Sequence, residues 1–96
     1  MKYTLIVKPE AELDILKSSQ WYEEKQKDLG LLFRDEVEEK SLFITKNPLH
    51  YQVRYKATLV ALVTHFPGVI PFIIEAEKVL VLAVLGTRED PEKWNK

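Results

Sequence analysis

The longest apolar stretch of this chain is Val79-Leu80-Val81-Leu82-Ala83-Val84-Leu85, and it gives the clearest indication of the fold. All of its residues are apolar, and its β-branched valines favour a β-strand. A strand with one face in water alternates apolar and polar residues, and this stretch does not. Residues 59–63, Leu-Val-Ala-Leu-Val, do not alternate either. We therefore expect a sheet in which both faces are at least partly covered.

Other segments belong to the same predicted sheet. Residues 4–7 are apolar and partly β-branched, and residues 59–65 and 69–74 are rich in strand-forming side chains. Pro71 lies inside the last of these segments, where a proline predicts an edge strand or a bulge. Glu75-Ala76-Glu77-Lys78 is predicted to be the hairpin turn that leads into the apolar stretch at residue 79.

Two helices are predicted between the first strand and the rest of the sheet. Pro9 suits the first turn of a helix, and apolar residues recur at helical spacing as far as Trp21 and Tyr22. We expect these two aromatic residues to pack in the core or between the helices. Gly30 is predicted to end this helix as its C′ residue. A second helix over residues 31–45 then completes an antiparallel hairpin.

The element order predicts one domain, residues 1–96, of the α+β class. In the order β-α-α-β-β-β, a two-helix hairpin packs on one face of a largely antiparallel four-stranded sheet, and a short helical turn begins at Asp90-Pro91. Two helices cover only one face of such a sheet. Either a partner chain, a second copy or the C-terminal segment covers the other face, or strong curl of the sheet and the tail hide it.

Composition excludes several classes of protein. The 96-residue chain has no cysteine, which excludes disulfides and zinc sites built on thiolates. Its net charge of −1 disfavours steering of the whole molecule onto nucleic acid. The longest apolar run, residues 79–85, is far shorter than a membrane span of about 20 residues. Since the N-terminus also has no secretory signal pattern, we expect a cytoplasmic protein without a membrane partner.

Neither a cofactor nor a metal ion is expected. The chain has 3 glycines, too few for a glycine-rich phosphate-binding loop. The acidic run Glu36, Glu38 and Glu39 has no companion histidines at metal-ligand spacing. This run is predicted to be a solvated face of the second helix.

Short motifs are spread along almost the whole chain. In chain order they are Glu12-Leu13-Asp14-Ile15, Trp21-Tyr22-Glu23-Glu24, Leu29-Gly30-Leu31-Leu32-Phe33, Asn47-Pro48, Phe66-Pro67, Leu82-Ala83-Val84-Leu85 and Arg88-Glu89-Asp90-Pro91-Glu92-Lys93-Trp94. Their order and spacing resemble those of the RelE/ParE family of toxins from bacterial type II toxin–antitoxin systems, also called plasmid stabilisation proteins. The resemblance implies the same β-α-α-β-β-β fold.

The resemblance also implies a function and partners. Members of the family inhibit growth: they either cut messenger RNA on the ribosome without a metal ion, or poison DNA gyrase. A cognate antitoxin wraps the toxin and neutralises it, which would account for the apolar sheet face. The implied assemblies are a homodimer or a toxin–antitoxin hetero-oligomer.

Departures from the family pattern favour the gyrase branch. Relatives often carry arginine or lysine on the strand before Phe-Pro, where this chain has Leu59, Val60, Thr64 and His65. With its balanced charge, the chain is therefore predicted to inhibit gyrase by protein binding. The alternatives are a ribosome-dependent messenger-RNA endoribonuclease and a degenerate relative that retains only antitoxin binding.

The nuclease alternative needs a base, an acid and a cation near the phosphate. Arg88, where nuclease members keep a functional arginine, and His65, beside the Phe-Pro turn, are the candidate catalytic residues. The alternatives are a salt bridge in the tail for Arg88 and a structural or solvent-exposed role for His65. Arg54, Tyr55 and Lys56 are candidates for binding RNA or another target, by contacting phosphate and stacking a base, or they form a solvated loop.

Overall fold

The computed structural model describes residues 3–51 and 53–86, and it confirms an α+β fold. In chain order the elements are β1 (Thr4–Val7), α1 (Pro9–Lys25), α2 (Leu29–Lys46), the 3-10 helix η1 (Pro48–His50), β2 (Val53–Tyr55), β3 (Thr58–Leu62), β4 (Gly68–Glu75), β5 (Lys78–Val81) and β6 (Leu85–Gly86). The helical turn predicted at Asp90-Pro91 lies outside the described residues.

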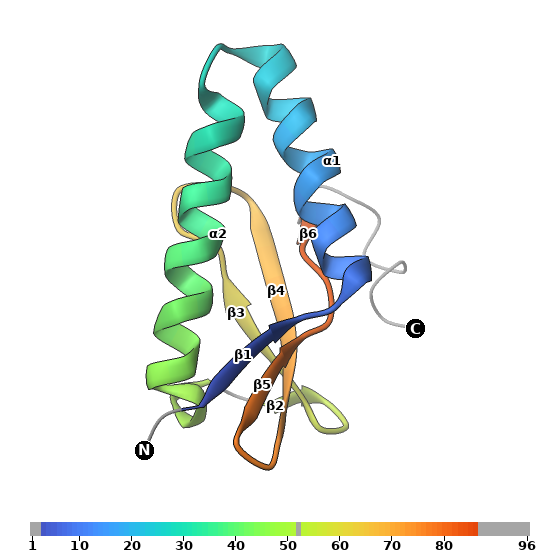
Figure 1. Ribbon diagram of the computed structural model, residues 1–96, viewed down its shortest axis with the longest axis vertical. Helices are drawn as coiled ribbons and strands as arrows, with labels where there is room; N and C mark the ends of the chain where they lie inside the picture. The colour runs from blue at the N-terminus through green and yellow to red at the C-terminus, as the bar shows by residue number, and fades with distance from the viewer. Residues whose placement is uncertain (1–2, 52, 87–96) are drawn as a thin grey trace.

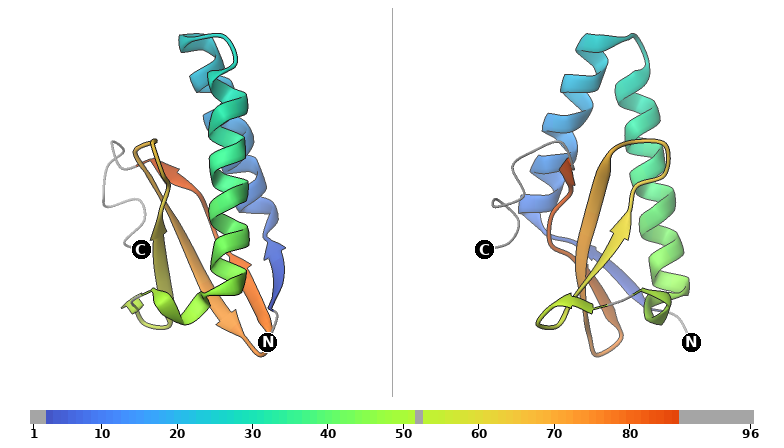
Figure 2. Two further views of the ribbon diagram at one scale, coloured as in Figure 1. Left: turned by 90° about the vertical axis from the view of Figure 1, so that its left-hand side faces the viewer. Right: turned by 180° about the vertical axis from the view of Figure 1, so that it is seen from behind.

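The strands form one six-stranded sheet in the order β1-β5-β4-β3-β2, with β6 paired to β4. β1 runs parallel to β5, and the other pairings of described strands are antiparallel. The predicted number of four strands is wrong, because β2 precedes β3 and because the strand predicted over residues 79–85 divides into β5 and β6. Figures 1 and 2 show α1 and α2 side by side on one face of the sheet, as predicted.

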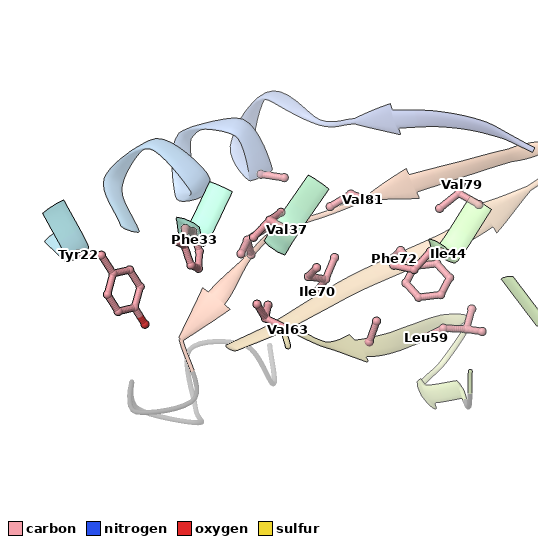
Figure 3. Packing of buried hydrophobic residues seen from close by; sticks show 13 residues of the cluster. Tyr22, Phe33, Val37, Ile44, Leu59, Val63, Ile70, Phe72, Val79 and Val81 are labelled. Carbon is pink, nitrogen blue, oxygen red and sulfur yellow. The ribbon is translucent and has the colours of Figure 1, made fainter. Parts of the chain in front are cut away.

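The side chains between the helices and the sheet form the core. We call the sheet face that points toward the helices the inner sheet face. Its largest fully buried side chains are Ile70, Phe72, Val79 and Val81, and Figure 3 shows them facing Val37 and Ile44 of α2. Tyr22 is buried, as expected, whereas Trp21 is 39% exposed and packs edge-on against the Tyr22 ring.

Gly30 does not end α1, so that prediction is wrong. α1 stops at Lys25, and Gly30 lies in the first turn of α2. The left-handed residue between the helices is Asp28, with φ 69°. A Cβ atom on Gly30 would lie 2.3 Å from the backbone oxygen of Ser19 in α1. Glycine is therefore needed at this position because the two helix backbones approach each other closely, and not because the chain turns there.

The start of α2 is held by a side chain from α1. The first backbone N–H groups of a helix have no partner within that helix, and no side chain of the N-cap residue Asp28 bonds to them here. Instead, the Glu23 carboxylate accepts hydrogen bonds from the N–H of Asp28 (2.9 Å) and the N–H of Gly30 (3.0 Å). The hairpin is thus closed by one acidic side chain placed at the positive end of the α2 dipole.

Pro71 lies in an interior strand, so the prediction of an edge strand is wrong. The alternative prediction was a bulge, and a bulge is present in the chain segment opposite Pro71. β4 pairs with β3 on one side and with β5 on the other. The Pro71 oxygen accepts from the N–H of Leu82 (2.9 Å), but proline has no N–H to return the second bond of that pair. β5 ends at this point, and residues 82–84 lie opposite only residues 70–71 before β6 rejoins β4. The N–H of Val84 in this bulge donates to the Asp14 carboxylate of α1 (3.1 Å).

Candidate functional site

The face of the sheet opposite the helices carries a row of aliphatic side chains. Ile6 of β1 pairs with Leu80 of β5, and Leu80 pairs with Ile73 of β4. Paired residues point to the same side of a sheet, and each of these three residues alternates with a residue of the inner sheet face. Together with Val60, Leu62 and Pro71, they form what we call the outer sheet face.

The outer sheet face is partly open to solvent. Leu62 is 66% exposed, Ile6 is 36% exposed, and the other four residues are half-buried. Val69, next to β6 on the same side, is buried. Neither α1 nor α2 crosses this side of the sheet (Figure 2).

A polar row borders these aliphatic side chains. Thr4, Lys78 and Glu75 are cross-strand neighbours at the end of the same face. A patch of aliphatic side chains with a charged rim is the arrangement found at protein–protein interfaces. The observed geometry therefore fits the expectation of an apolar sheet face that the two helices leave uncovered.

His65 lies in the turn that joins β3 to β4, and its backbone is left-handed with φ 69°. The turn is anchored by its neighbour Phe66, whose ring packs against Tyr22 of α1 (4.9 Å between centroids) and Phe33 of α2 (5.3 Å). The His65 side chain is 76% exposed, and its Nδ1 contacts the Glu36 carboxylate of α2. The contact ties the turn to the helix and engages one of the two ring nitrogens that proton transfer would use.

The other predicted site residues do not gather around His65. Arg54 and Tyr55 belong to β2, and Lys56 is an exposed turn residue with φ 51° between β2 and β3. Lys56 and His65 flank opposite ends of β3, whose five residues span roughly 17 Å. Arg88 lies outside the described residues. The catalytic and RNA-binding roles of these residues stay predictions.

A hollow beside His65 was not predicted from the sequence. The acidic run on α2 was expected to be solvated: Glu38 and Glu39 are exposed, whereas Glu36 is half-buried. Glu36 and Glu39 line this hollow together with Asp35 and Phe66. The signal in the sequence is the spacing of Leu32, Asp35, Glu36, Glu39 and Phe43, which places these residues on one side of a helix. Only the tertiary structure brings the β3–β4 turn against that side.

Aromatic rings also lie close together near the C-terminal end of α2. The Tyr51 ring packs edge-on against Phe72 of the inner sheet face (5.6 Å between centroids) and against His50 (5.2 Å). Burial raises the pKa of the Tyr51 phenol above its usual value of 10.0, because the charged phenolate is poorly solvated there.

Two further findings concern the described residues alone. Within residues 3–51 and 53–86, no group of three metal-ligating side chains is placed to hold a metal ion. Neither helix in that part of the chain is long and apolar enough to cross a membrane.

Comparisons with known proteins establish the fold. No protein-family model and no curated protein matches the chain. A chain in the solved structure titled "Chromosomal ParDE TA system from P. aeruginosa" superposes with a TM-score of 0.82 at 11% sequence identity. The match covers 91% of this chain and 98% of that chain. This protein therefore shares the complete fold of a chain from a ParDE system.

Proposed function

We propose that this chain is the toxin of a bacterial type II toxin–antitoxin pair, and that a cognate antitoxin neutralises it in the cytoplasm by covering the outer sheet face. The row formed by Ile6, Leu80 and Ile73 is the observation that carries this proposal. Neighbouring aliphatic side chains on three strands are shielded from water when an apolar segment of another protein packs on them. The shared fold with a chain of a ParDE system supports the proposal.

We propose gyrase inhibition by protein binding as the toxic activity. Cleavage of RNA would need a base, an acid and a cation within reach of one phosphate. Among the described candidates, His65 contacts Glu36, and Lys56 lies beyond the opposite end of β3. This separation, together with the net charge of −1, favours a protein target over RNA.

Antitoxin binding is tested with the product of the neighbouring reading frame, by titration calorimetry against this chain. Leu80→Lys places a charge in the centre of the outer sheet face, and we expect it to weaken binding by at least about 30-fold. Leu49→Lys is the matched control, because Leu49 lies in η1 and is 80% exposed. The control should bind like the wild type. Equal affinities of both variants would contradict the proposed surface.

The toxic activity is tested by expressing the chain alone in bacteria and by two assays on the purified protein. We expect growth arrest, blocked supercoiling by DNA gyrase, and intact messenger RNA on translating ribosomes. Cuts in messenger RNA that disappear in Arg88→Ala would instead establish the endoribonuclease alternative. Normal growth at high expression would leave antitoxin binding as the only retained function.

A further inference from the structure

The side of α2 that faces the β3–β4 turn forms a groove. Its main hollow, about 560 Å³, lies between Leu32, Asp35 and Glu36 of the helix and His65 and Phe66 of the turn. A second hollow of about 190 Å³ continues along the helix past Glu39 to Phe43 and Thr64. Both hollows share Glu36 and Glu39, so they form one groove.

The groove has apolar ends and an acidic centre. Leu32 is 54% exposed and Phe43 is 44% exposed, although both are large apolar side chains. They are 11 positions apart on α2, or about 17 Å along the helix axis. Asp35, Glu36 and Glu39 lie between them on the same side of the helix.

The acidic centre places like charges next to each other. Asp35 and Glu39 stand at positions i and i+4, where two like charges destabilise a helix. Within the described residues, neither carboxylate forms an ion pair, and the histidine in the groove contacts Glu36. Lys40 lies at the end of the groove with its Nζ over the Phe43 ring, 5.6 Å from the centroid. A cation placed between Asp35 and Glu39 would relieve the repulsion.

We propose that this groove is a second docking surface, which binds a segment of a partner protein that carries lysine or arginine between two apolar side chains. Long basic side chains place their charge on the carboxylates while their aliphatic stems cover apolar surface. The occupant is a protein and not a nucleic acid, because the carboxylates repel phosphate. This proposal takes from the proposed function only that the chain has a protein partner. It differs from that function in location, since the outer sheet face lies on the far side of the sheet from α2.

The test uses two synthetic helical peptides of about 16 residues. One carries a leucine near each end of one face and lysines between them, and the other replaces the lysines with glutamates. Binding to the intact chain is followed by NMR titration at low salt. We expect the lysine peptide to bind at least about tenfold more tightly than the glutamate peptide and to shift the signals of Leu32, Phe43 and Phe66.

Adjacent residues of α2 provide the matched variants. Glu39→Lys should weaken binding of the lysine peptide about tenfold. Glu38→Lys makes the same charge change at an exposed position that lines neither hollow. This control should change the affinity for the peptide less than about twofold. Leu80→Lys, which tests the antitoxin surface, should leave peptide binding unchanged.

Three results would overturn the proposal. The first is equal affinity for the two peptides, and the second is an equal loss of affinity in Glu38→Lys and Glu39→Lys. The third is self-association of the chain that Glu39→Lys abolishes, because the occupant would then be a second copy.

Discussion

The two faces of the sheet have similar composition and opposite surroundings. Phe72 and Ile73 are neighbours in β4, yet Phe72 is 0% exposed beneath the helices, and Ile73 is half-buried on the side that no described helix covers. Both faces are built mainly from aliphatic side chains, so hydrophobicity alone does not tell them apart. The inner sheet face therefore specifies the fold of the single chain, whereas the outer sheet face stays partly open to solvent and is the surface that we propose for a partner.

The largest expected effect comes from removing the centre of the inner sheet face. Phe72→Ala should lower the free energy of unfolding by about 3–5 kcal/mol, because it leaves a cavity under α2. Ile73→Ala is the matched change on the outer sheet face and should lower it by about 1 kcal/mol, since part of that side chain is already in water. Urea denaturation measures both values. Similar losses in the two variants would mean that the two faces contribute equally to the fold.

The second prediction concerns how closely α1 and α2 pack against each other. In Gly30→Ala, the new Cβ must move away from the Ser19 backbone oxygen. This overlap costs about 3 kcal/mol, and the better helix propensity of alanine returns about 1 kcal/mol. The net loss of about 2 kcal/mol should lower Tm by roughly 8–16 °C in a domain of this size. A gain in stability would show that Gly30 is an ordinary helical glycine.

Part of the fold could be predicted from the sequence because it depends on local patterns. Apolar and β-branched residues predicted β1, and helical periodicity with Pro9 predicted both helices. The predicted hairpin turn at residues 75–78 lies where β4 ends and β5 begins. The role of Gly30 could not be predicted, since a glycine after a helical pattern more often ends the helix than marks a close crossing. Pro71 was misjudged because its effect depends on which side of β4 its missing N–H faces, and that requires the strand order.

A smaller effect is expected at the connection between α1 and α2. Glu23→Ala removes the carboxylate that accepts from Asp28 and Gly30. We expect a loss of about 1 kcal/mol, typical of a lost helix cap. Glu24→Ala, at the neighbouring exposed residue, should stay within about 0.5 kcal/mol of the wild type. Thermal unfolding of both variants checks the difference, and equal Tm values would contradict the capping role of Glu23.

The smallest effect should appear only at alkaline pH, where Tyr51 packs on the edge of the core. Its raised pKa means that the unfolded state loses the phenolic proton first as the pH rises. The stability that neutral Tyr51 contributes is therefore present below about pH 10 and is lost as the pH rises through the pKa of the folded state. Urea denaturation between about pH 9 and about pH 11 should show a shallower decline in Tyr51→Phe than in the wild type. Parallel declines would contradict this assignment.

The candidate site could be predicted only in outline. The absence of alternation in residues 59–63 and 79–85 indicated an apolar sheet face, because that signal lies in consecutive residues. The contact of Glu36 with His65 joins residues that are 29 positions apart, so spacing in the sequence carries no information about it. The groove on α2 was missed for the same reason, since one of its walls is the β3–β4 turn.

Solvent accessibility of methyl groups tests the docking role of the outer sheet face most directly. With a soluble paramagnetic gadolinium chelate, the methyl NMR signals of Ile6, Ile73 and Leu80 should broaden in the free chain, whereas those of Val79 and Val81 should not. Addition of the protein encoded in the neighbouring reading frame should protect the first group and leave the second unchanged. If that protein binds while the methyl signals of Ile6, Ile73 and Leu80 remain broadened, the account is contradicted.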